Sequence, residues 1–219
     1  MRKWGLLGLV FALLPGISGC EVTQTVGGHE PVLGVWEYFV RDTDPAAARR
    51  KMTDLTTAGF EEAITNSFWA PGQTEPSPQE VAELRIAAEA AQQADVRPLL
   101  IVQNVGSRTT PRTPELRGQF AAYAASLARQ LPAYRDFIIG NEPNLNRFWM
   151  PQFGIDGENV AARDYLALLV ECYDALKAVS EDIRVIGGAL APRGGDDPDS
   201  SRHTHSPTQF IRDLGRYYR

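Results

Sequence analysis

Short runs of apolar residues alternate along this chain with longer segments in which apolar residues recur every three or four positions. The short runs predict β-strands, and the longer amphipathic segments predict α-helices. From residue 31 onward the two kinds of segment follow each other without interruption. The expected strands cover residues 32–39, 60–69, 96–105, 136–143 and 183–192. The expected helices cover residues 44–59, 77–95, 113–131, 159–181 and 206–219.

Several expected helices share a start signal, in which a polar residue that can cap the helix is followed by proline. Asp44-Pro45 and Ser77-Pro78 are two examples. The polar side chain accepts a hydrogen bond from the first turn, and proline suits the first helical position. Glu80 stands three residues after Ser77, which completes the pattern of a capping box.

The spacing of the expected strands predicts a parallel sheet. Their centres, taken at residues 34, 62, 99, 137 and 184, lie 28, 37, 38 and 47 residues apart. Each interval leaves room for a right-handed crossover through a helix. The pattern shows no domain boundary between residues 31 and 219, so we expect five strand–helix units in one α/β domain.

Two architectures fit five such units: an open doubly wound sheet and a TIM barrel. No G-x-G-x-x-G sequence follows the first strand, which removes the best support for a dinucleotide-binding sheet. Polar and aromatic residues instead collect at the carboxyl ends of all five strands, where a TIM barrel builds its site. We therefore favour a TIM-barrel type with five of its eight units present. The strand-end residues are Trp36, Glu37, Asn66, Trp69, Gln103, Asn104, Asn141, Glu142 and Arg193.

Composition excludes some classes of protein. Hydrophobic residues make up 43% of the 219 residues and charged residues 22%, which is typical of a folded domain. The net charge is −5, and the Lys and Arg residues form no long block. A nucleic-acid partner is therefore not expected.

The first 20 residues differ from the rest of the chain. Arg2 and Lys3 precede an apolar run from residue 5 to 14, followed by small residues, which is typical of a secretory signal. A buried N-terminal helix is the alternative. The exit Ile17-Ser18-Gly19-Cys20 resembles the bacterial lipobox, which implies a lipid on Cys20 and membrane anchoring, with residues 21–30 as a tether.

The expected location is therefore outside the cell: secreted, or lipid-anchored on the outer side of a bacterial cell membrane. Cleavage without lipidation and free secretion remains one alternative. A disulfide between Cys20 and Cys172, which would leave Cys20 unlipidated, is another. Two cysteines make neither a disulfide framework nor a structural zinc site.

The stretch Ile138-Ile139-Gly140-Asn141-Glu142-Pro143-Asn144 ends the fourth expected strand with an acid. Asn141-Glu142-Pro143 at that place resembles the acid/base motif of clan A glycoside hydrolases, which include family 5 (the cellulase family) and family 39. The resemblance implies that Glu142 is the general acid/base. It implies that Asn141 hydrogen-bonds the sugar 2-hydroxyl. The alternative is that the Glu142 carboxylate caps the next helix or pairs with Arg147.

Other strand-end residues are candidates for binding the sugar. Aromatic rings offer flat apolar faces to sugar C–H groups, and half-buried packing is the equally weighted alternative. The aromatic candidates are Trp36, Trp69 and Trp149, and the polar candidates are Glu37 and Asn104.

The resemblance implies a retaining glycoside hydrolase that acts on a polysaccharide or glycoside. Its nucleophile, a Glu at the end of a seventh strand, would lie beyond Arg219. We therefore expect residues 1–219 to be the N-terminal part of a barrel, poorly soluble and inactive alone because its outer strands expose unpaired edges. The alternatives are a non-catalytic carbohydrate-binding protein derived from such a barrel and an unrelated α/β-barrel enzyme.

No cofactor or metal is expected. His203 and His205 lie close in sequence, but no third ligand is spaced with them. Asp196, Asp197 and Asp199 lack the glycine and glutamate of a calcium loop. Residues 194–207 therefore suggest a solvated loop after the fifth strand.

Overall fold

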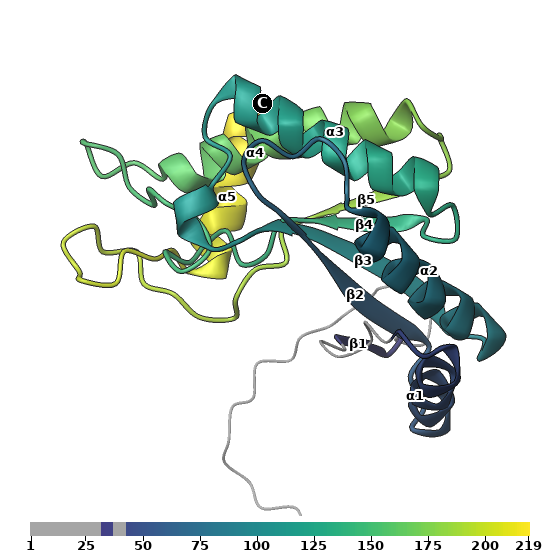
Figure 1. Cartoon of the computed structure of the whole chain (residues 1–219). Helices are drawn as coiled ribbons and strands as arrows, with labels where there is room; N and C mark the ends of the chain where they lie inside the picture. Colours follow the sequence, from purple (N-terminus) through teal and green to yellow (C-terminus); the bar gives the residue numbers. More distant parts are fainter. Residues whose placement is uncertain (1–31, 37–42) are drawn as a thin grey trace, which may run out of the picture. The chain divides into compact units, whose positions relative to one another are not determined.

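Five strands and five helices alternate along the chain in the computed structural model, which describes residues 32–36 and 43–219 (Figure 1). All five predicted strand–helix units are present. The predicted signal, the lipobox with Cys20, the tether and Glu37 lie outside the described residues. The strands are β1 (Gly34–Trp36), β2 (Glu62–Trp69), β3 (Arg97–Asn104), β4 (Asp136–Ile139) and β5 (Arg184–Gly187). The helices are α1 (Pro45–Thr57), α2 (Pro78–Gln93), α3 (Pro114–Gln130), α4 (Val160–Lys177) and α5 (Pro207–Tyr218), with a short 3₁₀ helix η1 at Ser107–Thr109.

The helices begin where the sequence places their caps. The Asp44 carboxylate accepts a hydrogen bond from the Ala46 amide at 2.9 Å, and the Ser77 hydroxyl accepts one from the Glu80 amide at 3.1 Å. Pro45 and Pro78 occupy the first helical positions. Glu80 also connects α2 with β2 and α3, because its carboxylate accepts hydrogen bonds from the hydroxyls of Ser67 and Tyr123, at 2.9 and 2.8 Å. None of the helices in the described part of the chain is long and apolar enough to cross a membrane.

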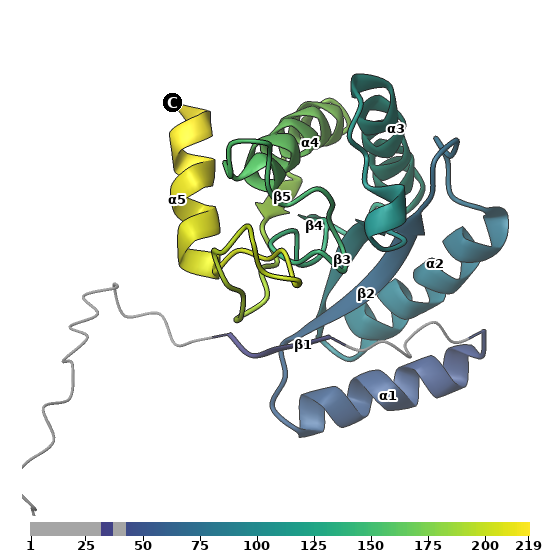
Figure 2. The ribbon, with the colours of Figure 1, turned by 90° about the vertical axis from the view of Figure 1, so that its left-hand side faces the viewer.

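The five strands form one parallel sheet in the order β1-β2-β3-β4-β5. A doubly wound sheet reverses its strand order at a switch point, whereas a TIM barrel adds its strands in sequence. The sequential order therefore confirms the barrel-type prediction. Figure 2 shows that α1 to α4 follow one another along one face of the sheet. We call this the outer face and the opposite one the inner face.

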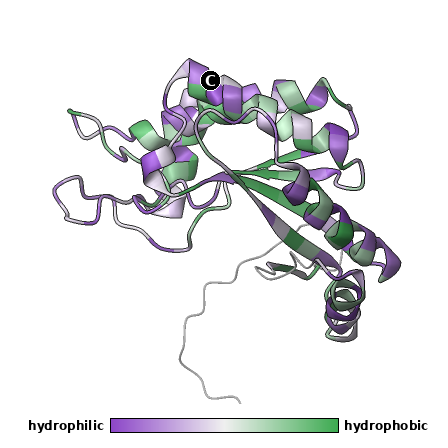
Figure 3. Ribbon diagram, viewed as in Figure 1, coloured by the Kyte–Doolittle hydropathy of each residue, from purple (hydrophilic) through white to green (hydrophobic). Residues whose placement is uncertain are grey.

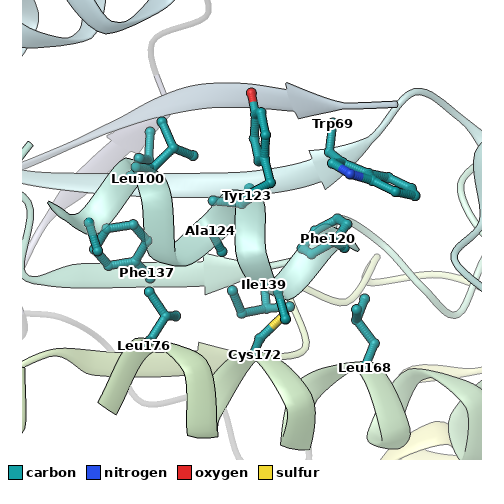
Figure 4. Packing of buried hydrophobic residues seen from close by; sticks show 14 of the residues in the cluster. Trp69, Leu100, Phe120, Tyr123, Ala124, Phe137, Ile139, Leu168, Cys172 and Leu176 are labelled. Atoms are coloured by element: carbon teal, nitrogen blue, oxygen red, sulfur yellow. The ribbon is translucent and has the colours of Figure 1, made fainter. Parts of the chain in front are cut away.

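The outer face of the sheet carries the main core. Leu100, Val102, Phe137 and Ile139 point toward the helices and pack with Phe120 of α3 and Leu168 of α4, among others (Figure 4). Figure 3 shows helices in which hydrophilic and hydrophobic residues alternate, as expected for helices with one face on the core. Burial on this face explains every second apolar residue of the central strands, and the others point to the inner face, which is also apolar in its middle.

The inner face is layered along the strand direction. At the amino ends of the strands, Asp136 pairs with Arg184 at 2.6 Å and with Arg97 at 3.6 Å, and Arg97 also pairs with Glu62. The middle layer is apolar, made of Leu99, Ile101 and Ile138, with Ile64 and Ile186 beside them.

At the carboxyl ends of the strands the inner face is polar again. The Gln103 amide donates to the Asn66 side-chain oxygen at 2.8 Å, and both side chains are buried. The charged groups at the amino ends neutralise one another. Barrel enzymes carry their chemistry at the carboxyl ends of the strands.

Candidate active site

The chain leaves β4 through Gly140, whose backbone places the two residues after it. The Gly140 amide donates to Val102 at 2.8 Å, so it still pairs with β3. Its φ of 75° lies in the left-handed region, and a Cβ there would approach a ring carbon of Tyr165 to 3.1 Å. Only glycine adopts that conformation readily in so little space.

Glu142 also has a left-handed backbone, with φ at 42°. This is uncommon for a residue with a side chain. Its amide donates to Ala189, beyond the end of β5, at 2.7 Å, and its carbonyl accepts from Leu145 at 2.9 Å. Both bonds hold the strained turn in place. Backbone strain of this kind is concentrated at functional sites.

The carboxylate of Glu142 is partly exposed and makes no hydrogen bond or ion pair with any residue of the described part of the chain. The alternatives of a helix cap or a pair with Arg147 therefore do not describe it. The Arg147 guanidinium instead lies over the ring of Phe148, 5.4 Å from its centre. A partly exposed carboxyl group without a protein partner can exchange a proton with a ligand.

Asn141 directly precedes Glu142 and is only 6% exposed. Its side-chain amide forms no hydrogen bond with the described residues. The two side chains that the resemblance assigns to chemistry therefore share one edge of the sheet, and neither bonds a residue of the part of the chain that the structure describes.

Tyr165 of α4 secures the end of β4 to the end of β5. Its hydroxyl donates to the Ile139 carbonyl and accepts from the Gly188 amide, both at 2.6 Å. Complete burial raises the pKa of this phenol, since the ionised form would lose its solvation. This role could not be predicted from the sequence, because a tyrosine fits the buried stripe of an amphipathic helix.

Asn144 performs a similar task for the loops. Its side-chain NH2 group shares its two hydrogens among the carbonyls of Ala191, Arg193 and His205, at 3.2, 3.1 and 2.9 Å. Its side-chain oxygen accepts from the Ala191 amide. The side chain is fully buried. It therefore ties the loop after β4 to the loop after β5. Sequence reasoning missed this residue, since nothing distinguishes it from its polar neighbours.

The three candidate tryptophans have different surroundings. Trp36 is registered with Ile64, which places it on the inner face at the carboxyl end of β1, and it is 44% exposed. That position suits stacking on a sugar. Trp69 is registered with Asn104 on the outer face, and its ring lies 5.2 Å from Phe120.

Sugar stacking is the wrong description for Trp69 and Trp149. Both are at most 1% exposed and belong to the core. The Trp69 indole N–H donates to the Gln73 carbonyl at 2.9 Å. The Trp149 ring meets Tyr165 edge-on, with centres 5.6 Å apart. The alternative of packing is therefore correct for both residues, and both side chains are fully buried instead of half-buried.

Asn104 is likewise occupied by the protein. Its amide donates to the Gly106 carbonyl at 2.7 Å and to the Phe148 carbonyl at 3.0 Å. It therefore supports the loop after β4 from the outer face of β3. The prediction that Asn104 binds the substrate directly is therefore wrong, because its side-chain amide is already bonded to the backbone.

The loop expected to be solvated contains one buried residue, His205, which is 2% exposed. Its Nε2 lies 3.0 Å from the Gln152 carbonyl, and its ring centre lies 4.1 Å from that of Phe153. His203 remains exposed. Within residues 32–36 and 43–219, no three His, Cys, Asp or Glu side chains are grouped so that they could hold a metal ion.

The sequence matches no protein-family profile and no curated protein. Solved structures do share the fold. A GH5_18 protein from Streptomyces cattleya in complex with Manb1-4GlcNAc aligns with a TM-score of 0.55 at 16% identity, over 72% of this chain and 44% of that one. A glycoside hydrolase family 5 enzyme from Prevotella bryantii aligns with a TM-score of 0.54 at 14% identity, over 75% and 56%. An endo-1,4-beta-mannanase from Rhizomucor miehei aligns with a TM-score of 0.52 at 10% identity, over 78% and 58%.

The alignments cover about half the length of these solved chains. Identities this low carry information about fold. Over the part that aligns, the five strand–helix units are similar in fold to the barrels of family 5 glycoside hydrolases.

Proposed function

We propose that this chain carries the acid/base half of a retaining glycoside hydrolase active site, with Glu142 as the general acid/base. One observation carries the proposal. Glu142, within Asn141-Glu142-Pro143, is held in a strained turn at the carboxyl end of β4, with its carboxylate unpaired. The proteins of similar fold include one described with a bound mannosyl disaccharide and one described as a mannanase, which supports a β-linked glycan as substrate.

The chemistry assigns two successive tasks to Glu142. When the glycosidic bond breaks, the leaving oxygen needs a proton, and the Glu142 carboxyl group donates it. The carboxylate then takes a proton from the water that hydrolyses the covalent glycosyl-enzyme intermediate. The attacking carboxylate, about 5–5.5 Å away in retaining enzymes, comes in this proposal from a strand after residue 219.

Two further residues complete the proposed subsite. The free amide of Asn141 hydrogen-bonds the sugar 2-hydroxyl, an interaction that strengthens in the transition state. Trp36 presents its ring from the inner face of β1, at the same edge of the sheet as Glu142, where a sugar unit of the substrate can stack on it.

The test replaces Glu142 by Gln in the natural protein that carries this chain. The variant keeps its size and hydrogen-bonding capacity but cannot donate a proton, so we expect cleavage of a natural β-linked glycan to fall by about 10²–10⁴-fold. The first step on an activated aryl glycoside should suffer far less, because its leaving group needs little protonation. Azide, which needs no base, should restore turnover and give a glycosyl azide of retained configuration.

A matched control is Glu61→Gln, the same change at an exposed residue just before β2, at the opposite edge of the sheet. It should leave both activities unchanged. Near wild-type cleavage of the natural glycan by Glu142→Gln would refute the assignment. A natural protein that binds the glycan but never cleaves it would support the non-catalytic alternative.

A further inference from the structure

A cavity of about 580 Å³ opens between the loop after β4 and the loop after β5. Its volume lies within the range of roughly 300–1,000 Å³ that small-molecule sites occupy. Three arginines line it, Arg147 from the first loop and Arg193 and Arg202 from the second. The remaining polar lining comes from Asn146, Ser200 and Thr204, and no carboxylate contributes.

The three arginines lack protein counter-charges. None forms an ion pair with a described residue, whereas Arg97, Arg117 and Arg184 are each paired with a carboxylate. All three side chains of the cavity are exposed. In a chain with net charge −5, three unpaired guanidinium groups around one cavity create a local attraction for anions.

The loop after β5 also separates its charges. Asp196 accepts a hydrogen bond from the Ser206 amide at 2.8 Å, and Asp197 accepts one from the Asp199 amide at 2.9 Å. These carboxylates are thus turned to the loop's own backbone and do not line the cavity. The loop is acidic in sequence, yet the charged residues that it contributes to the cavity are both arginines.

The backbone of each arginine is held by a hydrogen bond. The Arg147 carbonyl accepts from Ser107 at 3.0 Å, the Arg193 carbonyl accepts from the Asn144 side chain at 3.1 Å, and the Arg202 amide donates to the Ser200 hydroxyl at 3.2 Å. Leu145 and Thr204 join the two walls through an antiparallel bridge. The arginine side chains therefore project from backbone positions that are already set, which lowers the entropy lost when a ligand binds.

The cavity adjoins the proposed catalytic turn. Leu145, one of its lining residues, donates its amide to the carbonyl of Glu142 at 2.9 Å. A sugar unit in the cavity would therefore lie beside the turn that carries Glu142. Guanidinium groups bind carboxylates through two parallel, charge-assisted hydrogen bonds, and neutral sugars lack the negative charge that strengthens them.

We infer that this cavity is a subsite for an acidic sugar, in which Arg147, Arg193 and Arg202 bind the carboxylate of a uronic acid unit of the substrate. The inference rests on the proposed function, since it names the substrate class of the same site. It predicts a preference for acidic over neutral glycans that weakens as salt is added.

The test measures binding to the natural protein by calorimetry with three probes. These are xylotriose bearing one glucuronic acid, unsubstituted xylotriose, and a sulfated galactan oligosaccharide of similar length. We expect the glucuronic acid probe to bind on the order of tenfold or more tightly than xylotriose, because it adds charged hydrogen bonds. Arg193→Gln and Arg202→Gln should each remove most of that advantage while leaving xylotriose binding unchanged.

Arg49→Gln, the same change on the exposed surface of α1, is the matched control and should have no effect. Equal affinity for acidic and neutral xylotriose, or a preference unaffected by both arginine variants, would overturn the inference. Stronger binding of the sulfated probe than of the glucuronic acid probe would overturn the assignment to a carboxylate.

Failure here is distinguishable from failure of the proposed function. If Glu142→Gln destroys cleavage and the arginine variants change nothing, the acidic subsite is wrong and the acid/base assignment stands. If Glu142→Gln cleaves normally and the arginine variants lose the acidic probe, the cavity binds acidic sugars and the acid/base assignment is wrong.

Discussion

Replacing Tyr165 by Phe removes one oxygen atom from the support of the proposed catalytic turn. The ring contacts with Trp149 and Phe210, at 5.6 and 6.1 Å between centres, remain. What is lost is the hydroxyl that joins the Ile139 carbonyl to the Gly188 amide. Both backbone groups then have no partner in a site that the tyrosine ring still fills.

The cost follows from those two groups. An unsatisfied buried donor or acceptor costs about 1–3 kcal/mol. The Ile139 carbonyl is fully enclosed, whereas the bond to Gly188 is only partly buried, so water can reach that amide. We therefore expect the free energy of unfolding to fall by about 2–4 kcal/mol.

The measurement is urea denaturation of the natural protein and its variants. Tyr173→Phe is the matched control, because Tyr173 lies on the same helix but is 50% exposed, and its hydroxyl bonds no described residue. It should change the free energy of unfolding by less than about 0.5 kcal/mol. A Tyr165→Phe variant as stable as Tyr173→Phe, with an unchanged denaturant slope, would show that the hydroxyl does not secure the strand ends.

Two further predictions concern stability. Asn144→Ala removes the side-chain hydrogen bonds that reach Ala191, Arg193 and His205, and should cost about 2–4 kcal/mol in the same assay. Asn146→Ala, at a partly exposed neighbour, should cost less than about 0.5 kcal/mol. Equal losses in the two variants would refute the role of Asn144. Burial raises the pKa of Cys172 above its ordinary 9.0 and that of Tyr165 above its ordinary 10.0. The unfolded chain therefore releases these protons first. The free energy of unfolding should fall by about 1.4 kcal/mol per pH unit above about pH 9 because of Cys172, and by the same amount again above about pH 10 because of Tyr165. Cys172→Ala should flatten that decline between pH 9 and 10, and an unchanged slope would contradict this reasoning.

Element order and helix starts could be predicted from the sequence because their signals are local. A cap such as Ser77-Pro78 acts within one turn, and hydrophobic periodicity acts within one element. Strand ends were less accurate. The expected strand 136–143 stops at Ile139, because Gly140 turns the backbone into the left-handed region. The strand expected at 183–192 stops at Gly187, and Gly188 also has a positive φ, of 70°.

The direction of the strand-end side chains could not be predicted, because both faces of β2 mix polar and apolar residues. The outer face of a barrel strand is expected to be apolar, yet Thr65 and Ser67 lie there with Trp69. Their hydroxyls are bonded by the phenols of Tyr134 and Tyr123, which come from 69 and 56 residues further along the chain. Without those partners, alternation along β2 gives no clear sign of which tryptophan faces the site.

The hydrogen bonds that hold the site could not be predicted from the sequence for the same reason, because they join residues that lie far apart in the chain. Asn144 reaches Ala191 and His205, 47 and 61 residues away, and the Glu142 amide bonds to Ala189. The proposed acid/base and the arginine cavity are therefore held by one set of bonds between the loops after β4 and β5. A change that loosens the second loop should disturb both the turn at Glu142 and the cavity. Catalysis and the preference for acidic sugars are then expected to decline together in Asn144→Ala, but separately when Glu142 or Arg193 is replaced.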